Sequence, residues 1–346
     1  MHCKKSVFFC GTKDKVMGFR AEKLKLERKI GKIKIICLAV FAVIFTAFIL
    51  FSCFCPPETW KYHVAKPSVE KNGEGELRIT YLNVGQGDAT LIRFPDGQVM
   101  LIDGGAEGGD SSLSLMRYLN AAKIDTIDYL VLTHTDSDHS GGLVEVVKYK
   151  EVKKAYLPFV SSVNVNNAFS RLCTQLQKKN VPIFTADRSF KVDSLLEEYP
   201  YSVHCLSPNV GAQESENSNE NSCVVYLSYG EFGALFCGDA PSSIEEKIIR
   251  EYSLGLLNID GLCDTEILKV SHHGSSNGTS TEFLNFLGVE NAVISVGENN
   301  PYGHPSTDVL VGLQANGTNV FRTDKNGHIL AVVSSDGNYT LSGERE

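Results

Sequence analysis

The amino-acid sequence predicts an α/β protein with helices on the outside of two sheets, preceded by one helix that crosses a membrane. The chain has 346 residues, 42% hydrophobic and 21% charged, a composition typical of a globular protein with room for one large domain. From residue 77 onward, short runs rich in β-branched residues alternate with helical patterns. That alternation indicates layers of helix and sheet around a shared core.

The N-terminal residues indicate a membrane anchor. Residues 1–34 hold eleven Lys and Arg residues against three acidic ones, and residues 35–55 hold no charge. About 20 apolar residues are enough to cross the hydrocarbon core as a helix, and the basic flank keeps the N-terminus in the cytoplasm. We therefore expect a cytoplasmic arm at 1–34, a transmembrane helix at 35–55 and an extracellular catalytic domain, in a single-pass protein of the cell membrane.

This segment has two alternative interpretations. A cleaved secretory signal is disfavoured, because its apolar core is usually about 7–15 residues long and ends in a small-residue cleavage site. The letters "LFSC" end at Cys53 and resemble a lipoprotein motif, although Phe51 is atypical in it. Acylation of Cys53 is therefore the alternative anchor. A start at Met17 would shorten the arm and leave the topology unchanged.

The remainder of the chain is acidic. Residues 35–346 hold 22 basic and 38 acidic residues, a net charge of about −16, and no basic stripe of the kind that binds nucleic-acid phosphates follows residue 60. Five cysteines lie in the domain, without CxxC spacing, so their spacing indicates neither a disulfide framework nor a zinc knuckle. They are Cys173, Cys205, Cys223, Cys237 and Cys263.

The elements of the domain follow a linker at 56–75, which is rich in Pro, Gly and charge, and occupy residues 76–346. Three strands open the domain, with "PDG" as a hairpin turn between the second and third. Helices are indicated by apolar residues three or four positions apart after a serine start. The polar stretch 211–222 indicates a surface loop. We predict strands at 77–84, 88–94, 98–105, 129–133, 266–271 and 291–297, a hairpin at 223–240, and helices at 111–123, 242–252, 280–288 and 306–316.

Polar clusters close five of these strands, at the position where open α/β sheets bind ligands. They are "GQGD" at 85–88, "DGG" at 103–105, "THTDSDH" at 133–139, "GDA" at 238–240 and "SHHGS" at 271–275. One loop offers His134, Asp136, Asp138 and His139, and Asp239 and His272 can complete the set from neighbouring strands. This number of ligands fits a hydrolytic site with one or two metal ions.

These residues carry a family resemblance. "HTDSDH" is similar to the HxHxDH motif of the metallo-β-lactamase fold. "YLNVGQGDATLI", "LIDGG", "LTHTDSDHSGG", "NENSCVV", "FCGDA", "LKVSHHGSS" and "NPYGHPS" resemble, in this order, the extracytoplasmic metallo-β-lactamase-like domain of ComEC-type competence proteins over residues 78–335. The resemblance implies a four-layer αββα sandwich with metals at one edge. With one membrane segment in this chain, we expect any DNA channel to be a separate protein.

The resemblance implies metal ligands at His134, Asp138, His139, Asp239 and His272, with Asp239 bridging two ions and His273 competing with His272. Asp136 stands where the family has a histidine, and Ser222 where it has another; His204 is better explained as an ordinary strand residue. Replacement of imidazole by carboxylate shifts the preference from Zn²⁺ toward Mn²⁺. We therefore expect one or two divalent ions, Mn²⁺ or Zn²⁺.

Other residues gain roles beside the metals. Asp103 resembles the family's orienting aspartate, with a turn cap as the alternative. Asp88 lies near the same edge or shapes its hairpin. Lys269, within an apolar strand, either contacts an anionic substrate or pairs with a buried acid. His304 either donates a proton to the leaving group or is a turn histidine.

The leading hypothesis is therefore a membrane-anchored, metal-dependent hydrolase in which activated water attacks an ester, with Asp138, His304 and Lys269 in the reaction. A phosphodiester is the favoured bond. DNA, and with it a nuclease role in competence and DNA uptake, follows from the resemblance alone, and the acidic charge opposes tight non-specific DNA binding. A non-catalytic binding module on the same fold is the alternative. The physiological substrate and the oligomeric state stay open.

Overall fold

The computed structural model describes residues 11–54, 57–160, 166–212 and 215–345. The chain divides into two compact units, Met1–Lys61 and Tyr62–Glu346. Residues 1–10 of the predicted arm, Cys55 at the end of the predicted membrane segment and Pro56 at the start of the predicted linker lie outside the described residues.

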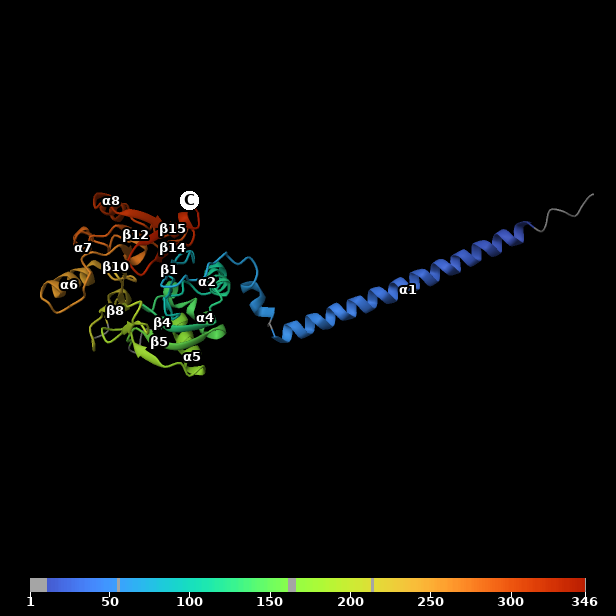
Figure 1. Ribbon diagram of the computed structural model, residues 1–346, viewed down its shortest axis with the longest axis horizontal. Coiled ribbons are helices and arrows are strands. Elements are labelled where there is room, and N and C mark those ends of the chain that lie inside the picture. Colours follow the sequence, from blue (N-terminus) through green and yellow to red (C-terminus); the bar gives the residue numbers. More distant parts are fainter. Residues whose placement is uncertain (1–10, 55–56, 161–165, 213–214, 346) are drawn as a thin grey trace, which may run out of the picture. The chain divides into compact units, whose positions relative to one another are not determined.

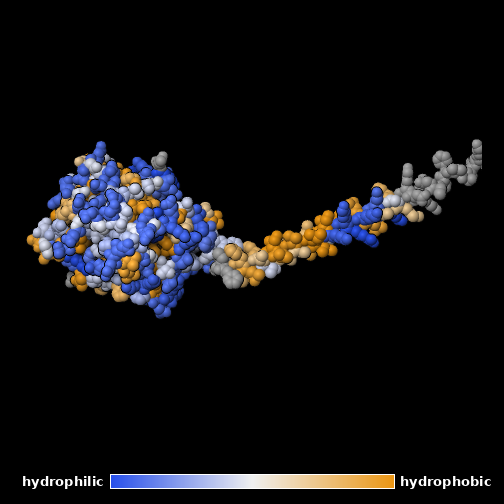
Figure 2. Space-filling model, viewed as in Figure 1, coloured by the Kyte–Doolittle hydropathy of each residue, from blue (hydrophilic) through white to orange (hydrophobic). Residues whose placement is uncertain are grey.

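The first unit is built on one long helix, α1, which runs from Gly11 to Phe54 without a break. The predicted basic arm, from residue 11 onward, and the predicted membrane segment are thus parts of the same helix. Figure 2 shows the hydrophilic N-terminal part of α1 and the apolar part that follows. Among the residues that the structure describes, α1 is the one helix long and apolar enough to cross a membrane, over Met17–Cys53. At 1.5 Å per residue, its charge-free part is about 30 Å long, the thickness of the hydrocarbon core.

The second unit contains two sheets in its described part. One has the strand order β15-β14-β1-β2-β3-β4-β5-β6 and the other β13-β12-β11-β10-β9-β8-β7. The first sheet comprises β1 (Leu77–Tyr81), β2 (Thr90–Arg93), β3 (Val99–Ile102), β4 (Thr126–Val131), β5 (Glu151–Leu157), β6 (Ile183–Thr185), β14 (Ile329–Val333) and β15 (Tyr339–Gly343). The second comprises β7 (Lys191–Asp193), β8 (Tyr201–Ser207), β9 (Val224–Tyr229), β10 (Phe232–Phe236), β11 (Ile267–Lys269), β12 (Asn291–Ile294) and β13 (Asn319–Arg322).

Helices cover the outer face of each sheet. The first sheet carries α2 (Gly109–Ala121), α4 (Leu143–Tyr149) and α5 (Asn167–Lys178), and the second carries α6 (Ser242–Ser253), α7 (Thr281–Leu287) and α8 (Thr307–Ala315). Figure 1 shows the two groups of helices on opposite sides of the strands. Two single-turn helices, α3 (Ser137–Ser140) and α9 (Thr323–Asn326), lie in loops. The predicted four-layer αββα sandwich is confirmed.

The layers follow from alternation along the strands. In β1, Leu77, Ile79 and Tyr81 join the core between the sheets, as alternate residues of β10 do from the other side. Leu235 of β10 points the other way, into the core beneath α6, α7 and α8. Both faces of these strands are therefore buried, and each large apolar side chain removed from water contributes about 1.5–3 kcal/mol.

The predicted linker at 56–75 begins with a 3-10 helix at Pro57–Tyr62. Tyr62 is 1% exposed, packs against Tyr149 and donates a hydrogen bond from its hydroxyl to the Glu145 carboxylate. The compact unit thus begins inside the linker that we predicted.

The topology brings the carboxyl ends of several strands to one edge. β3, β4 and β5 are parallel neighbours in the first sheet, as are β10, β11 and β12 in the second. The loops after β4, β10 and β11 hold residues 133–139, 237–240 and 270–275, which include most of the predicted ligands.

Candidate metal centre

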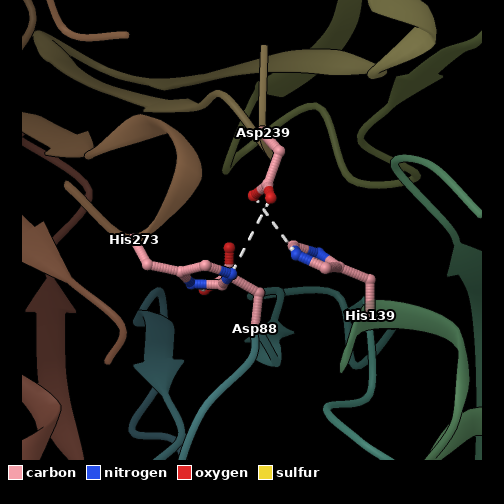
Figure 3. A group of neighbouring side chains, drawn as sticks. All are labelled: Asp88, His139, Asp239 and His273. Carbon is pink, nitrogen blue, oxygen red and sulfur yellow. Dashed lines mark ion pairs between the residues drawn. The ribbon is translucent and has the colours of Figure 1, made fainter. Parts of the chain in front are cut away.

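Asp239 lies at the centre of the cluster, in the turn after β10. Its Oδ1 is 3.2 Å from His139 Nε2, and its Oδ2 is 3.5 Å from His272 Nε2, 3.7 Å from His134 Nε2 and 3.8 Å from His273 Nε2. Figure 3 shows the carboxylate of Asp239 directed toward the rings of His139 and His273, with Asp88 beside them. One carboxylate therefore faces four imidazole rings.

The loop after β4 supplies ligands through α3. His134 lies in the loop after β4 and is fully buried, Asp136 precedes the first turn of α3, and His139 points inward from that turn. The amide of Asp88 donates to the carbonyl of Asp138 at 3.2 Å. Gly87 (φ 130°) lies against the same carbonyl, so closely that a β-carbon would collide with it. The "GQGD" loop therefore holds the "THTDSDH" loop in place.

His272 and His273 lie in an unusual turn after β11. Both have left-handed backbone conformations, with φ of 48° and 54°, which residues other than glycine seldom adopt. The turn directs both rings at the cluster: His273 Nε2 is also 3.3 Å from Asp138 Oδ2. The sequence left open whether His272 or His273 is the ligand. In the structure both rings face the cluster, so neither residue is excluded as a ligand. His273 is the more buried of the two.

The donor atoms suit a metal ion. His134 Nε2, His139 Nε2, His273 Nε2, Asp239 Oδ1 and Asp88 Oδ1 are buried and have no hydrogen-bond partner. One ligand atom from each of Asp88, His139, Asp239 and His273 fits within 4.8 Å of the others. Buried polar atoms without partners are costly, and a divalent cation coordinated by nitrogen and oxygen would satisfy them together. We conclude that the residues fit the predicted divalent metal.

Asp103, Thr133 and Ser222 hold the ligands in position. Asp103 Oδ2 lies 2.9 Å from His139 Nδ1 and accepts the Thr133 hydroxyl at 2.7 Å, while Oδ1 accepts the Thr133 amide. With Nδ1 bonded to the carboxylate, His139 Nε2 is left free toward Asp239. Ser222, where the family has a histidine, instead accepts the Asp239 amide at 3.3 Å. Its hydroxyl thus orients the central aspartate.

Lys269 has a buried carboxylate as its partner. Its Nζ lies 2.8 Å from Asp88 Oδ2 and 2.9 Å from the Val270 carbonyl, and its side chain is 3% exposed. This geometry favours the pairing of Lys269 with a buried acid over its contact with an anionic substrate, the other role predicted for it. Asp88, expected near the edge, lies among the donor atoms, so Lys269 compensates a carboxylate of the cluster itself.

His304 lies in the loop after β12, half-buried at the rim. Its ring centroid is 5.5 Å from that of His272 and 6.4 Å from that of His273, and its buried Nδ1 has no partner. Asn300 fixes the backbone of His304 through hydrogen bonds to its amide and carbonyl. Tyr302, 67% exposed, stacks on the His304 ring at 5.8 Å. Burial and the neighbouring His272 lower the pKa of His304.

Neighbouring charges keep the carboxylates ionised. Burial alone would raise the pKa of Asp239, but His139, His273 and His134 hold it well below its ordinary value. Burial also opposes ionisation of Asp138, yet the neighbouring imidazoles of His273 and His139 lower its pKa. For Asp88, the Lys269 ammonium outweighs burial and lowers the pKa. The acids are therefore poised to bind a cation.

The sequence did not point to two further residues. Ser218 donates to Asp136 Oδ1 at 2.7 Å, and Asn219 Nδ2 lies 3.5 Å from His272 Nδ1. Both belong to the stretch that we predicted only as a surface loop, and their polar composition carries no spacing that marks a site. His204, by contrast, lies within the second sheet on β8, opposite Tyr226 of β9.

Parts of the chain are similar to known proteins. Residues 82–161 match the metallo-β-lactamase superfamily. The chain is 30% identical over 275 residues to ComE operon protein 3 of Bacillus subtilis, covering 75% of this chain and 33% of that protein. It is 28% identical to competence protein ComA of Neisseria gonorrhoeae, and the match covers 73% of this chain and 32% of that protein. A solved structure described as a new diphosphatase from the PhnP family aligns with 14% identity and a TM-score of 0.40, covering 77% of this chain and 98% of that one.

The fold and the cluster define a metal-dependent hydrolase, and the chain has the fold of the metallo-β-lactamase superfamily. Within it, the relatives confirm the predicted resemblance to ComEC-type competence proteins. The chain spans about a third of the length of these relatives.

Proposed function

We propose that this protein is a membrane-anchored phosphodiesterase whose reaction takes place at the Asp239 cluster. The observation that carries the proposal is the convergence of buried, unpartnered nitrogen and oxygen donors from two sheets on one point. Buried polar atoms without hydrogen-bond partners do not stabilise a fold, so a cluster of them has no role in holding the structure together. The choice of a phosphodiester among esters is supported by the relatives, whose names connect them with competence.

Two groups of ligands are proposed around Asp239. His134 and Asp136, whose Nε2 and Oδ2 atoms are 3.7 Å apart, form one, and His273 with Asp138 forms the other. Asp239 lies between them, with His139 and His272 completing the set. Divalent ions held there would lower the pKa of water and stabilise the negative charge of the transition state.

The protein's own residues bind and orient the substrate and move a proton. Asp136, Asp138 and His272 have side chains 25–44% exposed and form the mouth of the site, while the remaining ligands are buried below. His304, at the rim, is placed to donate a proton to a leaving oxygen. Asn300 keeps its backbone fixed through paired hydrogen bonds.

Hydrolysis of bis-p-nitrophenyl phosphate by the full chain in detergent tests this function. We expect turnover that disappears with a chelator and returns with Mn²⁺ or Zn²⁺, together with at least one equivalent of bound metal by elemental analysis. Bound metal without turnover of this ester would favour the alternative, a non-catalytic binding module on the same fold.

A single-stranded nucleic acid is the proposed class of substrate. The exposed ring of Tyr302 stacks on His304 beside the cluster, and exposed aromatic rings next to a backbone site stack on bases. Tyr302→Ala should raise KM for an oligodeoxynucleotide and leave turnover of bis-p-nitrophenyl phosphate unchanged. An unchanged KM for the oligonucleotide would mean that Tyr302 does not bind the nucleic acid.

An Asp136→His variant tests the choice of metal. Because imidazole favours zinc and carboxylate favours harder ions, we expect the ratio of bound zinc to manganese to rise after loading in a mixture of both. Elemental analysis of both proteins measures this ratio. If it stays the same, Asp136 is not a ligand; Asp193→His, at an exposed position of the same fold, is the control.

The proposed topology places the N-terminus in the cytoplasm and the catalytic unit outside. A reporter fused after Glu346 should be active only outside the cytoplasm, because the basic arm is retained inside. Protection of that end from protease in intact spheroplasts would contradict this topology.

Cys53 lies near the end of α1 and is exposed. Loss of labelling by a palmitate analogue in Cys53→Ala would indicate the lipid anchor instead.

A further inference from the structure

Two buried cysteines of the second sheet lie in contact. Cys205 Sγ and Cys223 Sγ are 3.4 Å apart, although the residues are 18 positions apart in the sequence. Cys205 lies on β8 and is 4% exposed, and Cys223 immediately precedes β9 and is fully buried. Both belong to the core between the sheets.

The pairing of β8 with β9 produces this contact. Cys205 is opposite Val225, two residues beyond Cys223, and the register shifts between Cys205 and Ser207. Because alternate residues of a strand share a face, Cys223 and Val225 point to the same side as Cys205. The two sulfurs therefore need to approach by only about 1.4 Å to reach the length of a disulfide bond.

We propose that Cys205 and Cys223 form a disulfide bond when the protein meets an oxidant of the disulfide class. In the reaction a small-molecule or protein disulfide, R–S–S–R, accepts two electrons from the two thiols. The Cys205–Cys223 bond forms, the R–S–S–R bond breaks, and the two thiol protons leave on two R–SH products. The proposal is independent of the hydrolase function. An extracellular location would supply such oxidants.

The bond would brace one wall of the metal centre. The segment between the two cysteines carries Ser218 and Asn219, which contact Asp136 and His272. Ser222, next to Cys223, accepts the amide of Asp239. The amide of Cys223 itself donates to the Thr133 carbonyl at 2.8 Å, and Thr133 precedes His134. The cross-link would thus fix both ends of a loop that touches the ligands.

Peptide mapping of the full chain tests the bond directly. The protein is purified in detergent without reductant, and a portion is incubated with oxidised glutathione. Free thiols are alkylated under denaturing conditions before proteolysis and mass spectrometry. We expect a linked pair of peptides containing Cys205 and Cys223 in at least one of the two samples. Cys237, also buried but without a neighbouring thiol among the described residues, is the internal control and should be alkylated.

Linkage after glutathione only would support the bond and argue against an extracellular location. Alkylation of both thiols in both samples would overturn the proposal.

Thermal unfolding supplies a second readout. Closing a loop of this length should raise Tm by about 5 °C in a domain of this size. Tris(2-carboxyethyl)phosphine should therefore lower the Tm of the oxidised protein by that amount and leave Cys205→Ala and Cys223→Ala unchanged. Cys237→Ala should retain the response. A response to the reductant that survives in Cys205→Ala would contradict a Cys205–Cys223 bond.

Discussion

An Asp239→Ala variant is expected to lose bound metal and hydrolytic activity together. Among the described residues, Asp239 is the one whose carboxylate lies within 3.8 Å of His134, His139, His272 and His273. Removing it deletes the central ligand and leaves four imidazoles facing one another. We expect turnover of bis-p-nitrophenyl phosphate to fall by more than about 100-fold, beyond the loss typical of residues that only orient ligands.

Elemental analysis and initial rates on the same preparation measure both losses. Asp193→Ala is the matched control, because Asp193 belongs to the same sheet, on β7, and its side chain is 59% exposed. The metal-free forms of both variants should have the circular dichroism spectrum of the metal-free parent. Retention of metal with loss of activity would give Asp239 a role other than ligand. Retention of both would refute the proposed centre.

A His304→Ala variant is expected to keep its metal and lose turnover by about 10²- to 10⁴-fold, if His304 donates the proton to the leaving group. The loss should shrink for p-nitrophenolate, which needs little protonation, and grow for an alkoxide leaving group. The pKa of His304 is lowered by burial and by His272. The negative charge of a bound phosphoryl group favours the protonated ring and so offsets this shift.

Rates with a series of leaving groups distinguish the roles of His304. Equal losses for good and poor leaving groups would make it a positioning residue, and no loss would leave it a turn histidine. His204→Ala is the control, since His204 is a half-buried histidine within β8 of the same unit. It should retain both metal and turnover.

The sequence predicted the layers because strand alternation and helix spacing report burial directly. The two sheets, with Leu77 and Ile79 facing the inner core, confirm this. It also predicted which loops meet, since parallel strands end at one edge. It did not predict that Asp88 lies among the donor atoms with Lys269 behind it, because that pair joins residues 181 positions apart.

The local backbone conformation could not be predicted from the sequence for a different reason. Nothing in "SHHGS" indicates that two consecutive histidines take left-handed conformations, since neither residue requires one. The contact between Cys205 and Cys223 depends on the register of β8 and β9, which spacing between cysteines does not report. Ser218 and Asn219 lay in a stretch whose composition indicates only an exposed loop.

The turn at His272 and His273 has a consequence for the stability of the fold. A left-handed conformation costs a residue with a β-carbon about 1–2 kcal/mol relative to the right-handed one, so the pair consumes about 2–4 kcal/mol of a total stability that is usually about 5–15 kcal/mol. Glycine at either position would recover part of that cost and remove an imidazole from the centre. The turn therefore exchanges part of the stability of the fold for two imidazoles at the metal centre.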